Sequence, residues 1–153
     1  MTTDKIKTII RNKKAYHDYF VEQSLEAGIA LTGTEVKSLR QGKVNLLDAY
    51  AEVRRGEVWL IGSHINEYTH GNRENHDPMR ERKLLLNRNE IRKLDAKVKE
   101  KGFTLVPLSL YFKNGKVKVE LGLVRGKKLY DKRDTIAKKD FLRDQDRQHS
   151  IKY

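Results

Sequence analysis

Hydrophobic residues recur at every second position in several short stretches, which is the spacing of strands with one buried face. In residues 116–124 the alternating apolar positions are Val117, Val119, Leu121 and Leu123. A similar stretch, residues 105–112, precedes it, and Asn114-Gly115 lies between the two. Asn-Gly at such a place predicts a hairpin, because both turn residues adopt positive φ. Pro107 cannot donate a hydrogen bond to a neighbouring strand, so we expect an edge or a bulge there.

Three further stretches have the composition of strands. Residues 19–31 contain scattered large apolar residues, and Gly28 is expected at a bend or bulge. Residues 44–53 and 57–65 flank the short sequence Arg54-Arg55-Gly56, which predicts a second hairpin loop. Most of the middle of the chain is therefore expected to form strands.

Two helices have clear start and stop signals. Thr32-x-x-Glu35 is a capping box, and Gly42 occupies the position of a C-terminal cap. Asn87-x-x-Glu90 opens a second helix, before Gly102. The buried stripe of this second helix is predicted to be Ile91, Leu94 and Val98. Many short strands with two or three helices are typical of a small closed or nearly closed barrel.

The distribution of charge divides the chain into three regions. Residues 1–17 hold five Lys and Arg against one Asp, and are expected to form a basic arm. Residues 18–124 contain the strand and helix patterns of a single body. Residues 125–153 hold ten Lys and Arg against five Asp, with few large apolar side chains. We expect this tail to be disordered in isolation and to order on a partner.

Composition narrows the classes of partner and compartment. The 33 Lys and Arg residues outnumber the 21 Asp and Glu, which gives a net charge of +12 in a chain of 153 residues. A polyanion is the leading partner, and an anionic membrane surface is the second candidate. The absence of Cys excludes disulfides and thiolate zinc sites. No apolar stretch has the length of a membrane span or of a signal-peptide core, so the expected compartment is the cytoplasm.

No catalytic or metal-binding motif is complete. The stretch from Gly122 to Lys128 resembles a phosphate-binding loop, but it has three residues between its glycines and no Ser or Thr after the lysine. His70 and His76 are six residues apart, which is neither a helical nor a zinc-finger spacing. We therefore expect no enzyme activity, no metal and no cofactor.

Basic residues interleaved with aromatic ones point instead to nucleic acid. Each basic stretch alone is usually a solvated surface, but three in one cationic chain favour phosphate contacts and base stacking. The predicted RNA-binding residues of this kind are Lys13, Lys14, His17, Tyr19, Lys37, Arg40, Arg82 and Lys83. No helix-turn-helix, zinc-finger or basic-zipper pattern is present. Small barrels bind single strands and structured RNA through a strand face, so an RNA-binding barrel with a basic tail is predicted.

Six blocks of the sequence, in order and over about residues 12–133, resemble the small protein B family, the SsrA-binding proteins of bacterial ribosome rescue. The blocks are residues 12–20 (NKKAYHDYF), 26–28 (EAG), 33–40 (GTEVKSLR), 77–87 (DPMRERKLLLN), 108–114 (LSLYFKN) and 126–133 (GKKLYDKR). The resemblance implies a six-stranded antiparallel β-barrel of oligonucleotide-binding type, with about three helices and a basic C-terminal tail.

The resemblance also implies a function that is not enzymatic. Family members bind the tRNA-like domain of transfer-messenger RNA and deliver it to stalled ribosomes, where the tail lies in the empty decoding site and messenger channel. Indirect partners are elongation factor Tu and alanyl-tRNA synthetase. The alternative is a general RNA-binding or ribosomal barrel protein without preference for transfer-messenger RNA. A nuclease, which would need a catalytic constellation, and a peripheral membrane protein, which would need a wide apolar helix face, fit less well.

Site residues follow from the resemblance position by position. Glu26, Leu85 and Asn87 match family positions linked to RNA binding, although Asn87 could be only a helix cap and Glu26 only a salt-bridge partner. The matched tail residues, expected to contact the ribosome, are Gly126, Lys127, Lys128, Tyr130, Asp131, Lys132 and Arg133. Tyr130 stands where many relatives have His, which favours stacking over a charged role. Ile136, Ala137, Phe141 and Leu142 could form one narrow stripe if the tail becomes helical on the ribosome.

Overall fold

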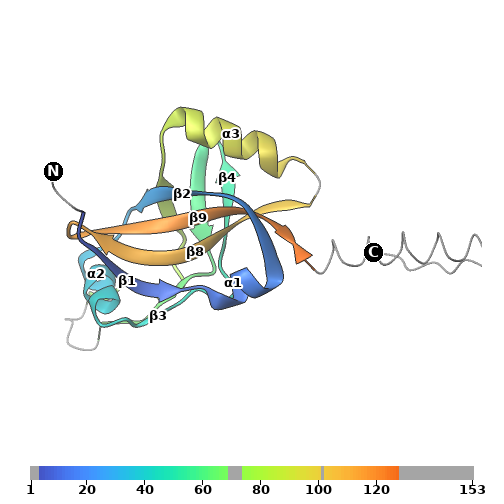
Figure 1. The fold of residues 1–153 in the computed structure, drawn as a ribbon. Helices are drawn as coiled ribbons and strands as arrows, with labels where there is room; N and C mark the ends of the chain where they lie inside the picture. Colours follow the sequence, from blue (N-terminus) through green and yellow to red (C-terminus); the bar gives the residue numbers. More distant parts are fainter. Residues whose placement is uncertain (1–3, 69–73, 101, 128–153) are drawn as a thin grey trace, which may run out of the picture.

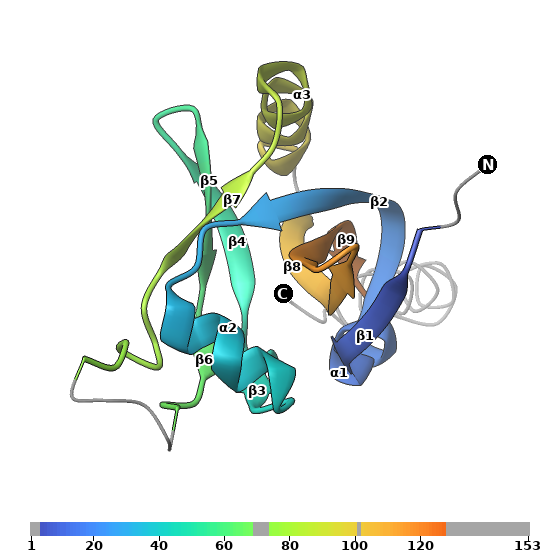
Figure 2. The ribbon, with the colours of Figure 1, turned by 90° about the vertical axis from the view of Figure 1, so that its left-hand side faces the viewer.

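The structure is a computed structural model, and it describes residues 4–68, 74–100 and 102–127. These residues form three helices and nine strands, numbered in chain order; Figure 1 labels most of them, and β5, β6 and β7 are labelled in Figure 2. The strands are β1 (Ile6–Arg11), β2 (Tyr19–Ile29), β3 (Val44–Asn45), β4 (Tyr50–Arg54), β5 (Glu57–Ile61), β6 (His64–Ile65), β7 (Arg82–Leu85), β8 (Phe103–Lys113) and β9 (Lys116–Gly126). The helices are α1 (Lys13–Asp18), α2 (Gly33–Arg40) and α3 (Arg88–Val98).

Six of the strands close into an antiparallel barrel, as the sequence and the family resemblance predict. The order around the ring is β8-β4-β5-β7-β2-β9, and β9 pairs again with β8. Figure 2 shows β2 curving from α1 over β8 and β9 towards β7. It pairs with β9 along most of its length and with β7 at its end. β1 adds to the free edge of β8, and β3 pairs with β6 in a separate two-stranded ribbon.

The barrel interior is filled by aliphatic side chains from every strand of the ring. Leu60, Leu84, Leu105 and Leu121 are among its fully buried members, and Leu94 packs against the same cluster from α3. A second, smaller cluster lies outside the barrel under α1, where Ala15 meets Val106, Leu108 and Val124. α1 therefore covers one end of the outer face of β8 and β9, and leaves the other end accessible.

The predicted turns and caps are confirmed. Asn114 and Gly115 have φ values of 51° and 83°, and join β8 to β9. Arg55 and Gly56 form the corresponding turn between β4 and β5, with φ values of 52° and 76°. Both predicted capping boxes are present, at the first turns of α2 and α3. These local signals fix where the elements begin and end.

Two irregularities in the strands test the sequence pattern. The register of β8 against β9 shifts between Pro107 and Ser109, so the predicted bulge is confirmed. The bulge considered for Gly28 is not there, because the register shift in β2 lies between Val21 and Gln23. A Cβ atom on Gly28 would lie 3.2 Å from Cβ of Leu85 on the paired strand. The glycine therefore allows a close side-chain approach rather than a bulge.

Residues 1–17 contain two elements that the sequence pattern does not predict. β1 pairs with β8, and α1 begins at Lys13. Asn12 joins them, since it is buried and its side chain donates to the carbonyl oxygens of Leu46 (3.2 Å) and Pro107 (2.9 Å). It also accepts a hydrogen bond from the Ala15 amide. This polar anchor holds a basic segment of low apolar content against the barrel.

Of the two histidines considered as metal ligands, one can be placed. His76 is buried, and its ring contacts the Thr34 hydroxyl and the Ile65 carbonyl oxygen. His70 lies outside the described residues. Among residues 4–68, 74–100 and 102–127, no three His, Asp or Glu side chains are grouped to hold a metal ion. In the same ranges, no helix is both long enough and apolar enough to span a membrane.

Candidate nucleic-acid interface

The predicted RNA-binding residues fall into separate places on the barrel. Glu26, Leu85 and Asn87 lie on or beside the outer face of β2 and β7. Lys13, Lys14, His17 and Tyr19 lie in α1 and at the start of β2. Lys37 and Arg40 lie on α2. The predicted residues therefore lie in several separate areas instead of one continuous site.

Glu26 lies in a network on the outer face of the sheet. Its carboxylate accepts a hydrogen bond from the Tyr111 hydroxyl (2.5 Å) and lies 3.3 Å from Lys113 Nζ. The Tyr111 hydrogen bond lowers the pKa of Glu26, against the effect of desolvation, and the ammonium group of Lys113 adds to the decrease. Burial and the hydrogen bond to Glu26 raise the pKa of Tyr111. At neutral pH the pair is therefore a carboxylate beside a protonated hydroxyl.

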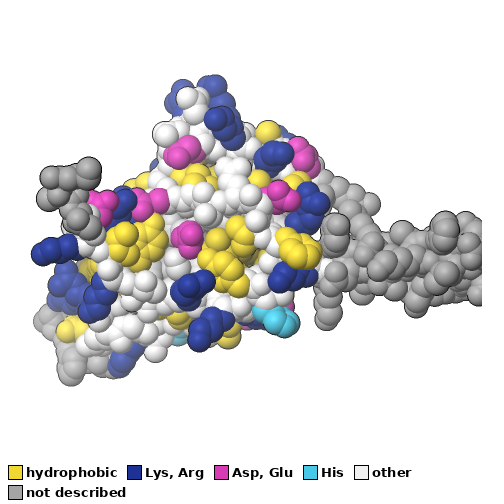
Figure 3. Space-filling view, viewed as in Figure 1, with side chains coloured by type: hydrophobic (Ala, Val, Ile, Leu, Met, Phe, Trp, Pro, Cys, Tyr) yellow, Lys and Arg dark blue, Asp and Glu magenta, His cyan; other side chains and the backbone are white. Residues whose placement is uncertain are grey.

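A groove of about 460 Å³ lies on the same outer face, formed by β1, β8, β9 and α1. We call it the strand-face groove; its lining residues are Ile6, Thr8, Arg11, Tyr16, Ser109, Tyr111 and Glu120. Figure 3 views this side of the molecule, with hydrophobic side chains grouped over the strands and Lys and Arg around them. A groove of this composition can stack a base and contact the adjoining phosphates.

Glu120 provides hydrogen-bond acceptors inside the strand-face groove. One of its oxygens, Oε1, accepts from Ser109 Oγ (3.2 Å) and from the Tyr16 hydroxyl (3.4 Å). The guanidinium of Arg11 lies 4.9 Å from the centre of the Tyr16 ring. Burial and the charge of Glu120 raise the pKa of Tyr16, so its hydroxyl remains a donor. The Tyr16 ring can stack on the face of an unpaired base, the Glu120 carboxylate can accept from its amino group, and the Arg11 guanidinium can contact a phosphate.

Leu85 and Asn87 adjoin Glu26 through strand pairing. Leu85 is directly opposite Gly28, two residues after Glu26, and half of its surface is exposed. Asn87 is the N-cap of α3, and its Oδ1 accepts from the Glu90 amide at 2.8 Å. The helix-cap role considered for Asn87 is therefore confirmed. Its amide nitrogen makes no hydrogen bond with any residue that the structure describes, and remains available as a donor.

The predicted cations of α1 are not the ones that lie over aromatic rings here; within the described residues those are Arg11, over Tyr16, and Lys127, over Phe20. Lys13 and His17 are exposed, and Lys14 forms an ion pair with Asp48 at 3.5 Å. Lys127 lies 5.2 Å from the centre of the Phe20 ring, and its Nζ donates to the Tyr16 carbonyl oxygen. Gly126 pairs with Tyr19, so β9 ends beside α1. The other predicted tail residues, Lys128, Tyr130, Asp131, Lys132, Arg133, Ile136 and Phe141, lie outside the described residues.

On α2, both predicted cations contact aromatic rings. The guanidinium of Arg40 lies 6.0 Å from the centre of the Phe112 ring. The Lys37 ammonium lies 5.5 Å from the centre of the Tyr68 ring. Arg40 and Lys7 also line a shallow apolar depression over Phe112. Both side chains have exposed positions and can meet phosphates.

The structure corrects the prediction for Arg82. Its side chain is fully buried and forms an ion pair at 2.6 Å with Glu35, which is equally buried. The other guanidinium nitrogens donate to Ser63 and to the carbonyl oxygens of Asp77 and Pro78. No donor is left for a phosphate, so Arg82 is a structural residue. Lys83 is partly exposed and forms an ion pair with Glu57 on the paired strand.

Several residues of this surface were not predicted. Tyr111, Lys113 and Glu120 lie on alternating strand positions, and the polar face of residues 116–120 is visible in the sequence. The register that brings these side chains to Glu26 and Tyr16 depends on the Pro107 bulge and on barrel closure. Sequence spacing alone could not place Tyr16 against Glu120, which is 104 residues away.

Comparisons with known proteins agree on one family. Residues 9–151 match the family model described as SmpB protein. An SsrA-binding protein of Acetivibrio thermocellus is 59% identical over 147 residues, which cover 96% of each chain. An SsrA-binding protein of Geobacter metallireducens is 62% identical over 138 residues, which cover 90% of each chain.

A solved structure has a similar fold. It is described as "tmRNA-SmpB: a journey to the center of the bacterial ribosome", and the matched chain is 51% identical with a TM-score of 0.66. The match covers 77% of the present chain and 83% of the other. At this identity the likeness extends beyond the shape of the barrel.

Proposed function

The chain belongs to the SmpB family, and on that premise we propose that it is an RNA-binding adaptor of ribosome rescue. It binds the tRNA-like domain of transfer-messenger RNA and delivers it to stalled ribosomes. The observation that carries the proposal is the 51% identity to a chain described as tmRNA-SmpB on the bacterial ribosome. The chain acts by binding and positioning RNA rather than by catalysis, in the cytoplasm.

The barrel supplies the contacts to transfer-messenger RNA. Tyr111 and Glu120 offer hydrogen bonds to base edges in the strand-face groove, and Glu26, which is bonded to Tyr111, offers acceptors beside it. Leu85 gives an apolar contact beside them, and Asn87 offers its free amide donors. Lys13, Lys14, His17, Lys37, Arg40 and Lys83 contribute contacts to phosphates around the barrel, and Tyr19 contributes a stacking surface. Arg82 supports this surface from inside.

The tail supplies the contacts to the ribosome. β9 ends at Gly126, Lys127 follows it, and the next segment carries the matched Lys128, Tyr130, Asp131, Lys132 and Arg133. It enters the empty decoding site and messenger channel, where its cations meet ribosomal RNA phosphates and Tyr130 stacks. Ile136 and Phe141, together with Ala137 and Leu142, form the apolar stripe of the helix that is proposed to form there. Elongation factor Tu and alanyl-tRNA synthetase are indirect partners through the RNA.

The test is binding to the tRNA-like domain, compared with an ordinary elongator tRNA, across a series of salt concentrations. Non-specific attraction to phosphates weakens with a slope of about 0.7–0.9 per neutralised phosphate on a log–log plot. A preference for the tRNA-like domain at physiological salt supports the adaptor. Equal binding that collapses with salt would establish a general RNA-binding barrel protein instead.

A further inference from the structure

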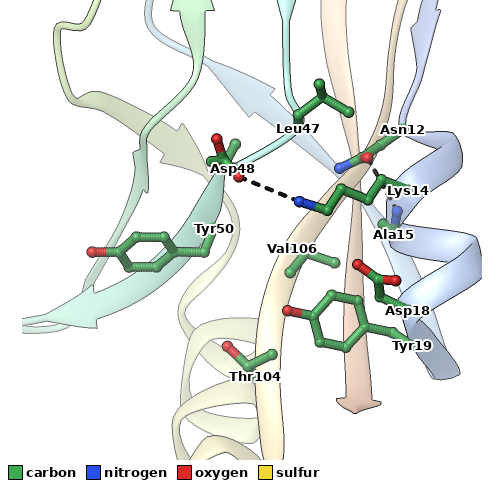
Figure 4. A pocket seen from close by; sticks show the side chains of 11 residues that line it. Asn12, Lys14, Ala15, Asp18, Tyr19, Leu47, Asp48, Tyr50, Thr104 and Val106 are labelled. Carbon is green, nitrogen blue, oxygen red and sulfur yellow. Dashed lines mark hydrogen bonds and ion pairs between the residues drawn. The ribbon is translucent and has the colours of Figure 1, made fainter. Parts of the chain in front are cut away.

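A cleft of about 310 Å³ separates α1 from the segment between β3 and β4 (Figure 4). α1 contributes Lys14 and Asp18 to one wall, and residues 47–50 form the other. Val106 and Thr104 of β8 lie between the walls. A volume of this size is at the lower end of small-ligand sites. The cleft shares no lining residue with the strand-face groove.

The charge inside the cleft is unlike that of the rest of the molecule. Asp18 and Asp48 line the cleft with one lysine, Lys14, and Asp18 also contacts the ring of the exposed His17, Nδ1 to Oδ1 at 2.9 Å, whereas the whole chain has a net charge of +12. Two carboxylates disfavour a phosphate in the interior, and they favour a group that donates N–H hydrogen bonds. The ligand should therefore present a neutral, donor-bearing part to the cleft and keep any phosphate at its rim.

The ion pair that crosses the cleft can be opened by such a ligand. Lys14 Nζ lies 3.5 Å from Asp48 Oδ1, and their side chains are 51% and 89% exposed. A solvent-exposed pair of this kind contributes little to stability. A ligand that replaces it gives Asp48 a new donor and leaves Lys14 free to meet a phosphate.

The remaining lining favours a flat aromatic ligand. The Tyr19 ring lies along the wall beside Val106, with its hydroxyl directed into the cleft (Figure 4). Within the described part of the chain, the hydroxyl groups of Tyr19 and Thr104 have no hydrogen-bond partner. A stacking ring with nearby carboxylates and free hydroxyls matches the faces and edges of a nucleobase.

We propose that this cleft binds one unpaired nucleobase with an exocyclic amino group, as part of an RNA strand. Tyr19 stacks on the base, Asp18 and Asp48 accept from the amino group, and Lys14 meets the adjoining phosphate. Uracil, which lacks this amino group, is disfavoured. The inference rests on the proposed RNA binding and adds a base-selective site to it. Glu26 is seven residues along β2 from Tyr19, about 23 Å at the rise of a strand.

The test compares cytidine and uridine 5′-monophosphates, which share ribose and phosphate and differ at the pyrimidine edge. The ¹⁵N-labelled full chain is titrated with each, and amide shifts are followed by NMR. We expect shifts at Asp18, Asp48 and Thr104, with cytidine monophosphate bound about tenfold more tightly, as one hydrogen bond to a carboxylate can provide. D18N and D48N should each reduce this preference, since an amide can also donate to uracil O4.

D95N is the matched control, because Asp95 forms an exposed ion pair with Lys99 on α3. It should leave the preference unchanged. Four outcomes would each overturn the cleft site. They are equal affinity for the two nucleotides, no binding of either, shifts confined to the strand-face groove, and a preference for cytidine monophosphate that survives both D18N and D48N. Binding of the unaltered chain to the tRNA-like domain is measured in parallel. If the chain prefers the tRNA-like domain to an elongator tRNA but the nucleotide test fails, only the cleft site is overturned. If the chain does not prefer the tRNA-like domain, the proposed function is overturned.

Discussion

Asn87 combines a structural and a functional role in one side chain. Its oxygen caps α3, while its amide nitrogen makes no hydrogen bond within the described residues. The two roles use different atoms, so they can be separated by substitution. A cap needs only an acceptor, whereas recognition of a base or a phosphate oxygen can use the donors.

N87D should keep the cap and remove the donors. Asp caps helices as well as Asn, so the free energy of unfolding should be nearly unchanged, while affinity for the tRNA-like domain falls. N87A should lose both, with a stability loss of about 1 kcal/mol. Urea denaturation and RNA titration of the two variants check this. Unchanged RNA affinity in N87D would restrict Asn87 to its role in the helix.

Glu35 joins three parts of the fold through one carboxylate. It receives hydrogen bonds from Arg82, from Arg80 and from the Thr32 amide. Desolvation by burial raises the pKa of Glu35, but the bonds from Arg80, Thr32 and Arg82 outweigh it and lower the pKa overall. Glu35 is therefore ionised in the folded protein at neutral pH, and it balances the buried charge of Arg82.

E35Q should lower the free energy of unfolding by about 3 kcal/mol at pH 7, because it leaves the buried guanidinium of Arg82 without a counter-charge. E81Q, which removes one partner of the exposed Arg54 ion pair, is the control and should change stability little. Chemical denaturation at neutral pH measures both. A small effect of E35Q would show that Arg82 keeps its charge balanced through other groups.

The same carboxylate predicts the pH dependence of stability. Since the pKa of Glu35 is lower in the folded than in the unfolded state, its contribution is complete above the unfolded value of about 4.3 and is lost as the pH falls through the folded value. The stability difference between the parent and E35Q should therefore shrink in acid. Urea midpoints at pH 7 and at about pH 3 provide the comparison. A constant difference would contradict the lowered pKa.

At the scale of elements, glycines decide how segments meet. Gly62, between β5 and β6, has a φ of 80°, and a Cβ atom there would lie 2.9 Å from the Asp48 carbonyl oxygen. The close approach of Gly62 to the Asp48 backbone positions the segment that forms one wall of the cleft beside α1, which we call the α1 cleft. Gly33, in the first turn of α2, has no atom within 4 Å of such a Cβ.

G62A should destabilise the fold by at least about 1–2 kcal/mol, because the positive φ and the backbone clash add. G33A is the matched control, and it should be neutral or slightly stabilising, since Ala restricts the unfolded chain. Thermal denaturation of both variants tests the expectation. Equal melting temperatures would mean that the β5–β6 turn relaxes without cost.

At the scale of the whole molecule, body and tail are proposed to serve different RNAs. Lys127 contacts Tyr16 and Phe20 and lines neither the strand-face groove nor the α1 cleft. Lys128 lies outside the described residues. We therefore expect the charge of Lys127 to be dispensable for the barrel face that is proposed to bind transfer-messenger RNA.

The double variant K127A/K128A removes both charges. Its affinity for the tRNA-like domain should stay within about twofold of the parent's, because substitutions of surface residues usually change a free energy by no more than about 0.5 kcal/mol. Tagging of nascent chains on stalled ribosomes should fall strongly. The two assays are run on the same protein, with K99A on α3 as a control for loss of charge. Equal losses in binding and tagging would contradict the division between body and tail.

The sequence alone determined the local features of this protein. The Asn114-Gly115 turn, the two capping boxes and the Pro107 bulge each depend on a few neighbouring residues whose backbone preferences are strong. The excess of basic residues pointed to nucleic acid in the same way, because net charge does not depend on the fold. Six ordered blocks were enough to indicate the family.

Only the tertiary structure decided which side chains meet. Arg82 and Lys83 are adjacent in the sequence, yet the first is buried against Glu35 and the second faces outward, because strand neighbours point to opposite faces. β1 is placed by its pairing with the edge of β8 and by Ile9 and Ile10, which pack against the barrel core, whereas α1 is placed by Asn12 and by the small cluster on the outer face of β8. The strand-face groove and the α1 cleft join residues far apart in the chain, which come together only when the barrel closes.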